Sequence, residues 1–138
     1  MSSTLVTDTS VVYAALNRDE KHHRRCASLL ASSSPVVLPA PVITETSLLS
    51  LSRRRPRAAD ALLRSVVDGS VAVVDLQTQD YLRVRELIAR YVDLGLSVVD
   101  ASVVAIAERL EETTIATLDR RHFSVVQPLH CEAFTLVP

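Results

Sequence analysis

Short runs of apolar residues alternate with longer amphipathic segments along the whole chain. The short runs are rich in Val, Ile and Leu and are bounded by turn-forming residues, which is typical of strands buried in a parallel sheet. Strands that alternate with helices predict an α/β fold with a mainly parallel sheet. The predicted strands lie at residues 5–6, 36–38, 71–74, 114–117 and 134–137.

The longer segments place apolar residues three and four positions apart, as amphipathic helices do. Thr9 and Ser10 are suited to cap the first helix and Asp19 the second, because short polar side chains accept hydrogen bonds from a helix start. Pro41 suits the first turn of the third helix. The predicted helices lie at residues 11–16, 20–31, 42–51, 57–67, 77–91 and 98–110.

Length and composition indicate one folded domain over residues 1–138, without an internal repeat. A chain of this length buries about 68% of its unfolded surface. Hydrophobic residues make up 48% of the chain, which excludes a disordered protein. No signal peptide is visible, and a charge or a proline interrupts every apolar run before it could span a membrane. We therefore expect a cytoplasmic protein.

The net charge of -1 gives no overall attraction to nucleic acid. The basic side chains are almost all arginines and are clustered in the sequence, so local patches can still hold phosphates. A solvated surface explains the same clusters. The two cysteines, Cys26 and Cys131, fit no zinc or redox spacing, and we expect Cys26 to be a buried thiol.

Four acidic residues stand out by position. Asp8 and Asp119 follow the first and fourth strands, and ligands of parallel sheets bind at the carboxyl ends of the strands. Glu45 and Asp100 lie in the first turns of two helices, where the helix dipole favours negative charge. Capping and turn formation offer a purely structural explanation for each of the four.

The neighbours of Glu45 and Asp100 at three and four residues are mostly apolar. Both acids therefore lie on the apolar side of their helices, which a dipole alone does not explain. Asp75 is expected to have a turn role, although it also follows a strand. The remaining acids singled out for solvated faces are Asp19, Glu20, Glu108, Glu111 and Glu112.

Acids from two strand ends and two helix starts can converge at one edge of the sheet. Two like charges about 4 Å apart repel by roughly 4 kcal/mol at an effective dielectric near 20, so such a cluster must take up protons or bind a cation. With no Cys or His expected nearby, an all-oxygen ligand set suits Mg²⁺ or Mn²⁺ rather than zinc.

Four short motifs carry a resemblance that runs nearly end to end. They are Val6–Ser10, Thr44-Glu45 after Pro41, Leu96–Ser102 and Ala116–Phe123. In this order and at these separations they resemble the PIN-domain ribonucleases, most closely the VapC-type toxins of bacterial toxin–antitoxin pairs. Relatives often carry a further acid close behind the fourth one, where this chain has Arg120, Arg121 and His122, so a second metal is not expected to be fully bound.

The resemblance implies a three-layer α/β/α fold with a five-stranded sheet in the order 3-2-1-4-5. It implies a Mg²⁺-dependent endoribonuclease, Mn²⁺ being possible, that forms a homodimer and is neutralised by a small cognate antitoxin. The metal-binding and catalytic acids would be Asp8, Glu45, Asp100 and Asp119, with Ser10 and Thr117 as supporting hydroxyls.

Two clusters of arginines are expected to bind RNA phosphates, with a solvated face or an antitoxin contact as an equal alternative. They are Arg53, Arg54, Arg55, Arg57, Arg120 and Arg121. Two other functions are compatible with the sequence. One is a PIN-like RNA-binding or assembly module whose acids no longer cut, and the other is a phosphoacceptor domain that uses Asp8 with Asp75. The second lacks the strand-end lysine expected for that chemistry.

Overall fold

A computed structural model describes residues 4–33 and 35–138. Five strands form one sheet in the order β3-β2-β1-β4-β5, and every neighbouring pair is parallel. The predicted topology is therefore confirmed, and each strand lies within one or two residues of its predicted bounds. The strands are β1 (Leu5–Thr7), β2 (Val36–Pro39), β3 (Ala72–Val74), β4 (Thr114–Ala116) and β5 (Thr135–Val137).

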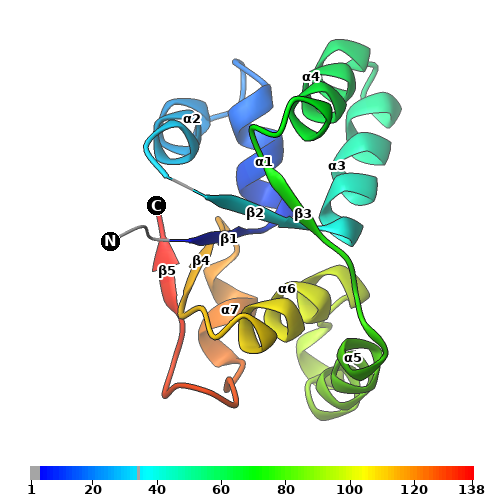
Figure 1. Cartoon of the computed structure of the whole chain (residues 1–138), viewed down its shortest axis with the longest axis vertical. Coiled ribbons are helices and arrows are strands. Elements are labelled where there is room, and N and C mark those ends of the chain that lie inside the picture. The colour runs from blue at the N-terminus through cyan, green and yellow to red at the C-terminus, as the bar shows by residue number, and fades with distance from the viewer. Residues whose placement is uncertain (1–3, 34) are drawn as a thin grey trace.

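Helices cover both faces of the sheet, as the three-layer fold requires (Figure 1). Helices α1 to α4 lie on one face and α5 to α7 lie on the other. A short 3-10 helix, η1 (Val92–Leu94), follows α5. The α-helices are α1 (Thr9–Leu16), α2 (His23–Ala31), α3 (Ala40–Ser52), α4 (Pro56–Val67), α5 (Thr78–Arg90), α6 (Val98–Arg109) and α7 (Arg120–Val125).

The core is built around β1 and α6. All residues of β1 are buried, and every residue of α6 from Ala101 to Ala107 is at most 2% exposed. Cys26 is also fully buried, as expected for a structural thiol. Within the described residues, no helix has both the length and the apolar character needed to cross a membrane.

Helix α2 begins at His23, so the prediction that Asp19 caps a helix starting at residue 20 is wrong. The Asp19 carboxylate instead accepts two hydrogen bonds from the guanidinium of Arg55, one of them 2.9 Å long. This partner is 36 residues away in the sequence. Because the carboxylate is engaged there, it is unavailable to the backbone of α2.

The expected solvated face for Glu108 is also wrong. Its side chain is only 8% exposed and accepts hydrogen bonds from Nε and Nη2 of Arg83 at 2.8 and 3.0 Å. The backbone N–H of Leu129 donates a further bond of 2.8 Å to the same carboxylate. Glu108 therefore joins α5, α6 and the C-terminal segment.

Two helices end with a side-chain-bearing residue in the left-handed conformation that favours glycine. Arg54 follows α3 with φ 58° and Glu111 follows α6 with φ 56°. After each helix, the next backbone N–H reaches back across the last turn: Arg55 to the carbonyl of Ser50 at 2.7 Å, and Glu112 to that of Ala107 at 2.9 Å. These bonds are those of the Schellman motif, whose left-handed position is usually glycine.

Candidate metal centre

Asp8 directly follows β1 and is the N-cap of α1. Its Oδ1 accepts a hydrogen bond of 2.7 Å from the backbone N–H of Thr9. Its Oδ2 accepts bonds from the hydroxyls of Ser10 at 2.9 Å and Thr117 at 2.8 Å. The residue is only 4% exposed. The two hydroxyls that the resemblance implied as supporting groups therefore both contact Asp8.

The same hydroxyls connect Asp8 to the segment that follows β4. The Ser10 hydroxyl accepts from the backbone N–H of Leu118, and the Thr117 hydroxyl accepts from that of Asp119, both at 2.9 Å. The backbone N–H of Asp8 in turn donates to the carbonyl of Ala116 at 2.9 Å. One hydrogen-bond network therefore fixes the ends of β1 and β4 relative to each other.

Burial raises the pKa of the Asp8 carboxyl from 3.8 to about 6. The hydroxyl donors of Thr117 and Ser10 act in the opposite direction, because they stabilise the charged form, and the nearby negative charge of Asp100 adds to the increase. The donors therefore do not offset the loss of water around this carboxylate. A cation close to Asp8 would supply the missing stabilisation.

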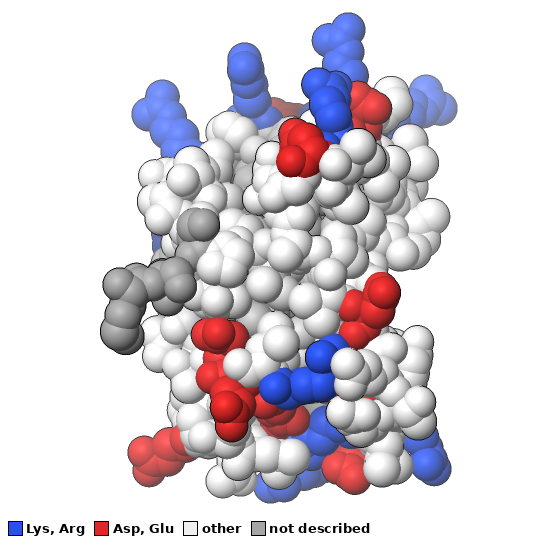
Figure 2. All heavy atoms as spheres, viewed as in Figure 1, with Lys and Arg blue, Asp and Glu red and all other residues white. Residues whose placement is uncertain are grey.

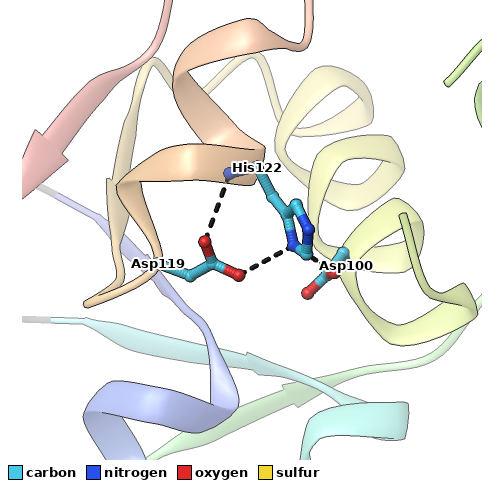
Figure 3. Close-up of side chains that lie close together, drawn as sticks. All are labelled: Asp100, Asp119 and His122. Carbon is cyan, nitrogen blue, oxygen red and sulfur yellow. Dashed lines mark hydrogen bonds and ion pairs between the residues drawn. The ribbon is translucent and has the colours of Figure 1, made fainter. Parts of the chain in front are cut away.

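Asp100, Asp119 and His122 lie together beside α6 and α7 (Figure 3). Each offers one ligand atom, and these three atoms all lie within 4.8 Å of one another. The Nδ1 atom of His122 is 3.1 Å from Oδ2 of Asp100 and 2.7 Å from Oδ2 of Asp119.

Each of these acids also stabilises the start of a helix. Asp100 forms a capping box with Ser97 at the start of α6, and Asp119 caps α7 by accepting from the backbone N–H of His122 at 3.2 Å. The structural explanations considered from the sequence are therefore correct as far as they go. They leave the convergence of the three side chains unexplained.

The Nδ1 atom of His122 is buried and has no hydrogen bond of acceptable geometry, although two carboxylate oxygens are close to it. Ligand atoms this close together suit shared coordination of a cation, although a protonated imidazole would also form ion pairs with both carboxylates. Carboxylate oxygens and an imidazole nitrogen fit Mn²⁺ as well as Mg²⁺. The expectation that no histidine lies near the acids is thus wrong.

Sequence reasoning missed His122 as a site residue. The signal was its position three residues after Asp119, which puts two side chains on the same face if a helix begins there. Because helix α7 was not predicted, the three-residue spacing between Asp119 and His122 could not be recognised as a helical one.

Glu45 lies outside this three-residue group. It lines an open groove of about 650 Å³ along α3, and Val99, next to Asp100 in α6, lines the same groove. The structure therefore brings Asp100 and Asp119 together, links Asp8 to the backbone of Asp119 through the Thr117 hydroxyl, and places Glu45 in the adjoining groove. Asp75 is exposed after β3, outside the cluster, which gives no support to a phosphoacceptor pair with Asp8.

Across residues 4–33 and 35–138, no arginine or lysine forms an ion pair with any of the four predicted site acids. Other buried acids do have such partners. Asp80 is bound by Arg109 at 3.0 Å, and Glu108 is bound by Arg83. The buried Asp8 therefore differs from Asp80 and Glu108 in that no permanently cationic side chain is paired with it.

The arginines predicted to bind RNA fall into two groups. Arg120 and Arg121 begin α7 directly after Asp119, and Arg120 donates to the carbonyl of Pro138 at 2.8 Å. The other four lie around the connection between α3 and α4, after the last residue of α3. Only the first group adjoins the acids.

The fold, with acidic residues at one edge of the parallel sheet, defines a class of α/β protein. The family model described as the PIN domain matches residues 5–127. The chain belongs to the PIN-domain family. The resemblance noted from the four motifs is thereby confirmed.

Individual relatives agree with this assignment. Ribonuclease VapC26 of Mycobacterium tuberculosis (strain ATCC 25618 / H37Rv) is 29% identical over 135 residues, which is 97% of this chain and 100% of the relative. The crystal structure of VapC20 from M. tuberculosis, described as a sarcin-ricin loop cleaving toxin, matches with a TM-score of 0.74 and 26% identity over 80% of this chain and 86% of that one. VapBC2 from Rickettsia felis, solved bound to a promoter DNA fragment, matches with a TM-score of 0.71 and 14% identity over 98% and 99% of the two chains, and it shares the fold.

Proposed function

We propose that this protein is a Mg²⁺- or Mn²⁺-dependent endoribonuclease that hydrolyses phosphodiester bonds of RNA. The observation that carries the proposal is the convergence of Asp100, Asp119 and His122 close to the buried Asp8, without a basic side chain that neutralises all of them. Similarity to a ribonuclease over almost the entire chain supports RNA as the substrate.

A divalent cation at this site would offset the carboxylate charges, bind a phosphate and lower the pKa of a water molecule. Asp8, Asp100 and Asp119 are the residues that would hold it, with His122 as an additional ligand. The hydroxyls of Ser10 and Thr117 keep the Asp8 carboxylate in one orientation. We assign to Glu45 the orientation of the attacking water, because it lines the groove beside α6.

In the proposed reaction, a water oxygen attacks phosphorus in line with the bond to the 3′ oxygen. A new P–O bond forms as the P–O3′ bond breaks, and one proton of the water passes to the departing oxygen. The products carry a 5′-phosphate and a 3′-hydroxyl. No histidine pair is required to activate a ribose 2′-hydroxyl.

The test replaces Asp100 by Asn and measures cleavage of labelled RNA with Mg²⁺ or Mn²⁺, and again with EDTA. We expect wild-type cleavage to need the metal and the variant to lose at least a hundredfold in rate, since it loses a charged ligand. Glu132→Gln, at an exposed acid elsewhere in the chain, is the control. Cleavage by folded Asp100→Asn at the wild-type rate would exclude this mechanism.

We further propose that a small antitoxin neutralises the enzyme by covering the acids, and that the free enzyme is a homodimer. Support comes from the likeness to VapC20, which is described as a toxin, and from the shared fold of the VapBC complexes. Light scattering on the purified chain tests the dimer. Loss of RNA cleavage on addition of the antitoxin tests the neutralisation.

The second candidate function is an RNA-binding module without catalysis. The observation in its favour is His122, whose imidazole lies between two carboxylates and could neutralise them without an ion when protonated. The EDTA experiment separates the two functions. RNA binding without any metal-dependent cleavage would select the module.

A further inference from the structure

Basic side chains gather at one end of the molecule, although the chain as a whole is nearly neutral. Residues 17–68 hold nine of the 15 Lys and Arg residues but five of the 16 Asp and Glu residues. Figure 2 shows several of the basic side chains projecting from the end formed by α2, α3 and α4. The remainder of the chain is correspondingly acidic.

A cavity of about 520 Å³ opens at this end, between the end of α1 and the connection from α3 to α4. We call it the arginine pocket, because its lining includes Arg18, Arg54, Arg55 and Arg57. The carboxylate among its lining residues is Asp19, which Arg55 binds through two N–H groups. This pair holds the pKa of Asp19 below its usual value and removes its charge as an obstacle to an anion.

Two contacts hold the α3–α4 connection, which forms one side of the pocket, against neighbouring residues. The Arg53 guanidinium lies 5.0 Å above the ring of the buried Tyr13 in α1, a cation–π contact. With the Arg55–Asp19 pair, it fastens the α3–α4 connection to the region around α1. Arg53 and Arg55, which were predicted to bind RNA, thus contact Tyr13 and Asp19 of this protein.

Three arginines of the pocket remain available to a ligand. In the part of the chain that the structure describes, Arg18, Arg54 and Arg57 form no ion pair and no side-chain hydrogen bond. Helix α4 starts at Pro56 in the same pocket, with no acid in its first turn and no side chain that caps it. Three free guanidinium groups beside an uncapped helix start favour binding of an anion.

Arg54 adopts a left-handed backbone conformation that costs energy for a residue with a side chain. Its φ of 58° is one that glycine adopts without penalty, and sites of such strain often serve function. Glu111 holds the corresponding position after α6 with φ 56°, so the strain alone does not mark a site. What distinguishes Arg54 is the presence of other free arginines around the same cavity.

We propose that the arginine pocket binds a backbone phosphate of the RNA substrate, away from the bond that is cut. The assignment of this anion to RNA rests on the proposed function. Helix α1 starts at Asp8 and ends at the pocket, and its 8 residues span about 12 Å. Helix α1 itself is covered by its neighbours and gives only the scale of the separation. An RNA strand carries a phosphate at every nucleotide, so one bound at the acids has further phosphates that could reach the pocket. Guanidinium groups bind each of them through paired N–H donors.

The test measures binding of a labelled single-stranded RNA in the non-cleaving Asp100→Asn background with Mg²⁺. We expect Arg54→Gly and Arg57→Ala each to weaken binding about tenfold, the loss typical of one charge-assisted hydrogen bond. Each should also lower the slope of log affinity against log salt by about 0.7, the value for one phosphate contact on a single strand.

Glu111→Gly is the matched control, since it makes the same backbone change at the other Schellman motif. Both glycine variants should leave the melting temperature unchanged or raise it, because both relieve a left-handed residue. Only Arg54→Gly should weaken RNA binding. RNA affinity equal to the background in both arginine variants would overturn the proposal.

A labelled oligoglutamate peptide, titrated in parallel, distinguishes phosphate from carboxylate ligands. If the arginine variants lost peptide binding but kept their RNA binding, the phosphate assignment would be overturned and an acidic protein partner indicated.

In the enzyme with Asp100 intact, Arg54→Gly should raise KM for RNA about tenfold and leave kcat unchanged. Weaker RNA binding by the pocket variants without any wild-type cleavage would refute the nuclease and retain the pocket. Metal-dependent cleavage with an unchanged KM in Arg54→Gly would retain the nuclease and refute the pocket as an RNA-binding site.

Discussion

At the scale of single residues, Asp8 has two roles that conflict in the absence of metal. It caps α1 and links α1 to the segment after β4, which needs an oxygen acceptor at that position. It also carries a carboxylate that is almost completely removed from water. An amide oxygen could fill the first role without the cost of the second.

This conflict predicts a pH dependence of stability in the metal-free protein. The folded-state pKa of Asp8 is about 6 against 3.8 for the ordinary carboxyl. The folded protein thus holds the proton more tightly than the unfolded chain, and the free energy of unfolding falls as the pH rises through this interval. The decrease is about 3 kcal/mol, fully present above about pH 7 and absent below about pH 4.

Asp8→Asn lacks this titration. In EDTA, urea unfolding should show the variant gaining about 3 kcal/mol relative to the wild type between about pH 4 and pH 8. Asp93→Asn, at an exposed acid of η1, is the control and should follow the wild type. A difference between Asp8→Asn and the wild type that stays constant with pH would contradict this prediction.

The identity of the side chain at position 122 should set the metal preference of the enzyme. Imidazole nitrogen is a softer ligand than carboxylate oxygen and favours Mn²⁺ relative to Mg²⁺. His122→Asp restores an all-oxygen set, so the ratio of cleavage rates with Mg²⁺ and Mn²⁺ should rise about tenfold or more in favour of Mg²⁺. The readout is that ratio, and His22→Asp controls for the added charge. An unchanged ratio would remove His122 from the ligand set.

The four acids predicted for the site could be singled out in the sequence because each has a local signature. Asp8 and Asp119 follow strands, and Glu45 and Asp100 interrupt apolar stripes. His122 had no such signature, since its meaning depends on α7, a helix too short to show a periodic pattern.

At the scale of elements, local sequence predicted the strands and most helices to within two residues. Proline in the first turn of α3 and the turn at Gly69 after α4 are signals read within a few residues. The predicted start of α2 was wrong because Asp19 is bound by Arg55. The predicted solvated position of Glu108 was wrong because Arg83 binds it from another helix. Both errors arise from pairs distant in sequence.

The Arg83–Glu108 pair predicts a specific loss of stability. Arg83→Ala leaves the carboxylate of Glu108 enclosed with only the Leu129 N–H as a donor from outside its helix. The free energy of unfolding should fall by about 2 kcal/mol, since Arg83 is partly exposed and water moderates the cost. Urea unfolding measures the loss.

Arg85→Ala is the matched control, because Arg85 lies two residues away on the exposed side of α5. It should change stability by no more than about 0.5 kcal/mol. Adding Glu108→Gln to Arg83→Ala should recover part of the loss, because the enclosed charge is then removed. Equal effects of Arg83→Ala and Arg85→Ala would show that the pair contributes nothing.

At the scale of the whole molecule, the alternating pattern predicted the α/β class, and the family resemblance supplied the strand order. Parallel pairing follows from helices that return the chain to the same edge of the sheet. The arginine pocket could not be predicted in this way, because its lining comes from the end of α1 and the α3–α4 connection, which only the packed structure brings together.

The separation of charge has a consequence for how a polyanion first meets this protein. The field of the basic end extends about 8 Å at physiological ionic strength, whereas the acids repel the same molecule until a cation is bound. Early encounters should therefore occur at the basic end, which performs no chemistry, and the strand should reach the acids only afterwards. RNA would thus be bound at the basic end first and cleaved later at the acids.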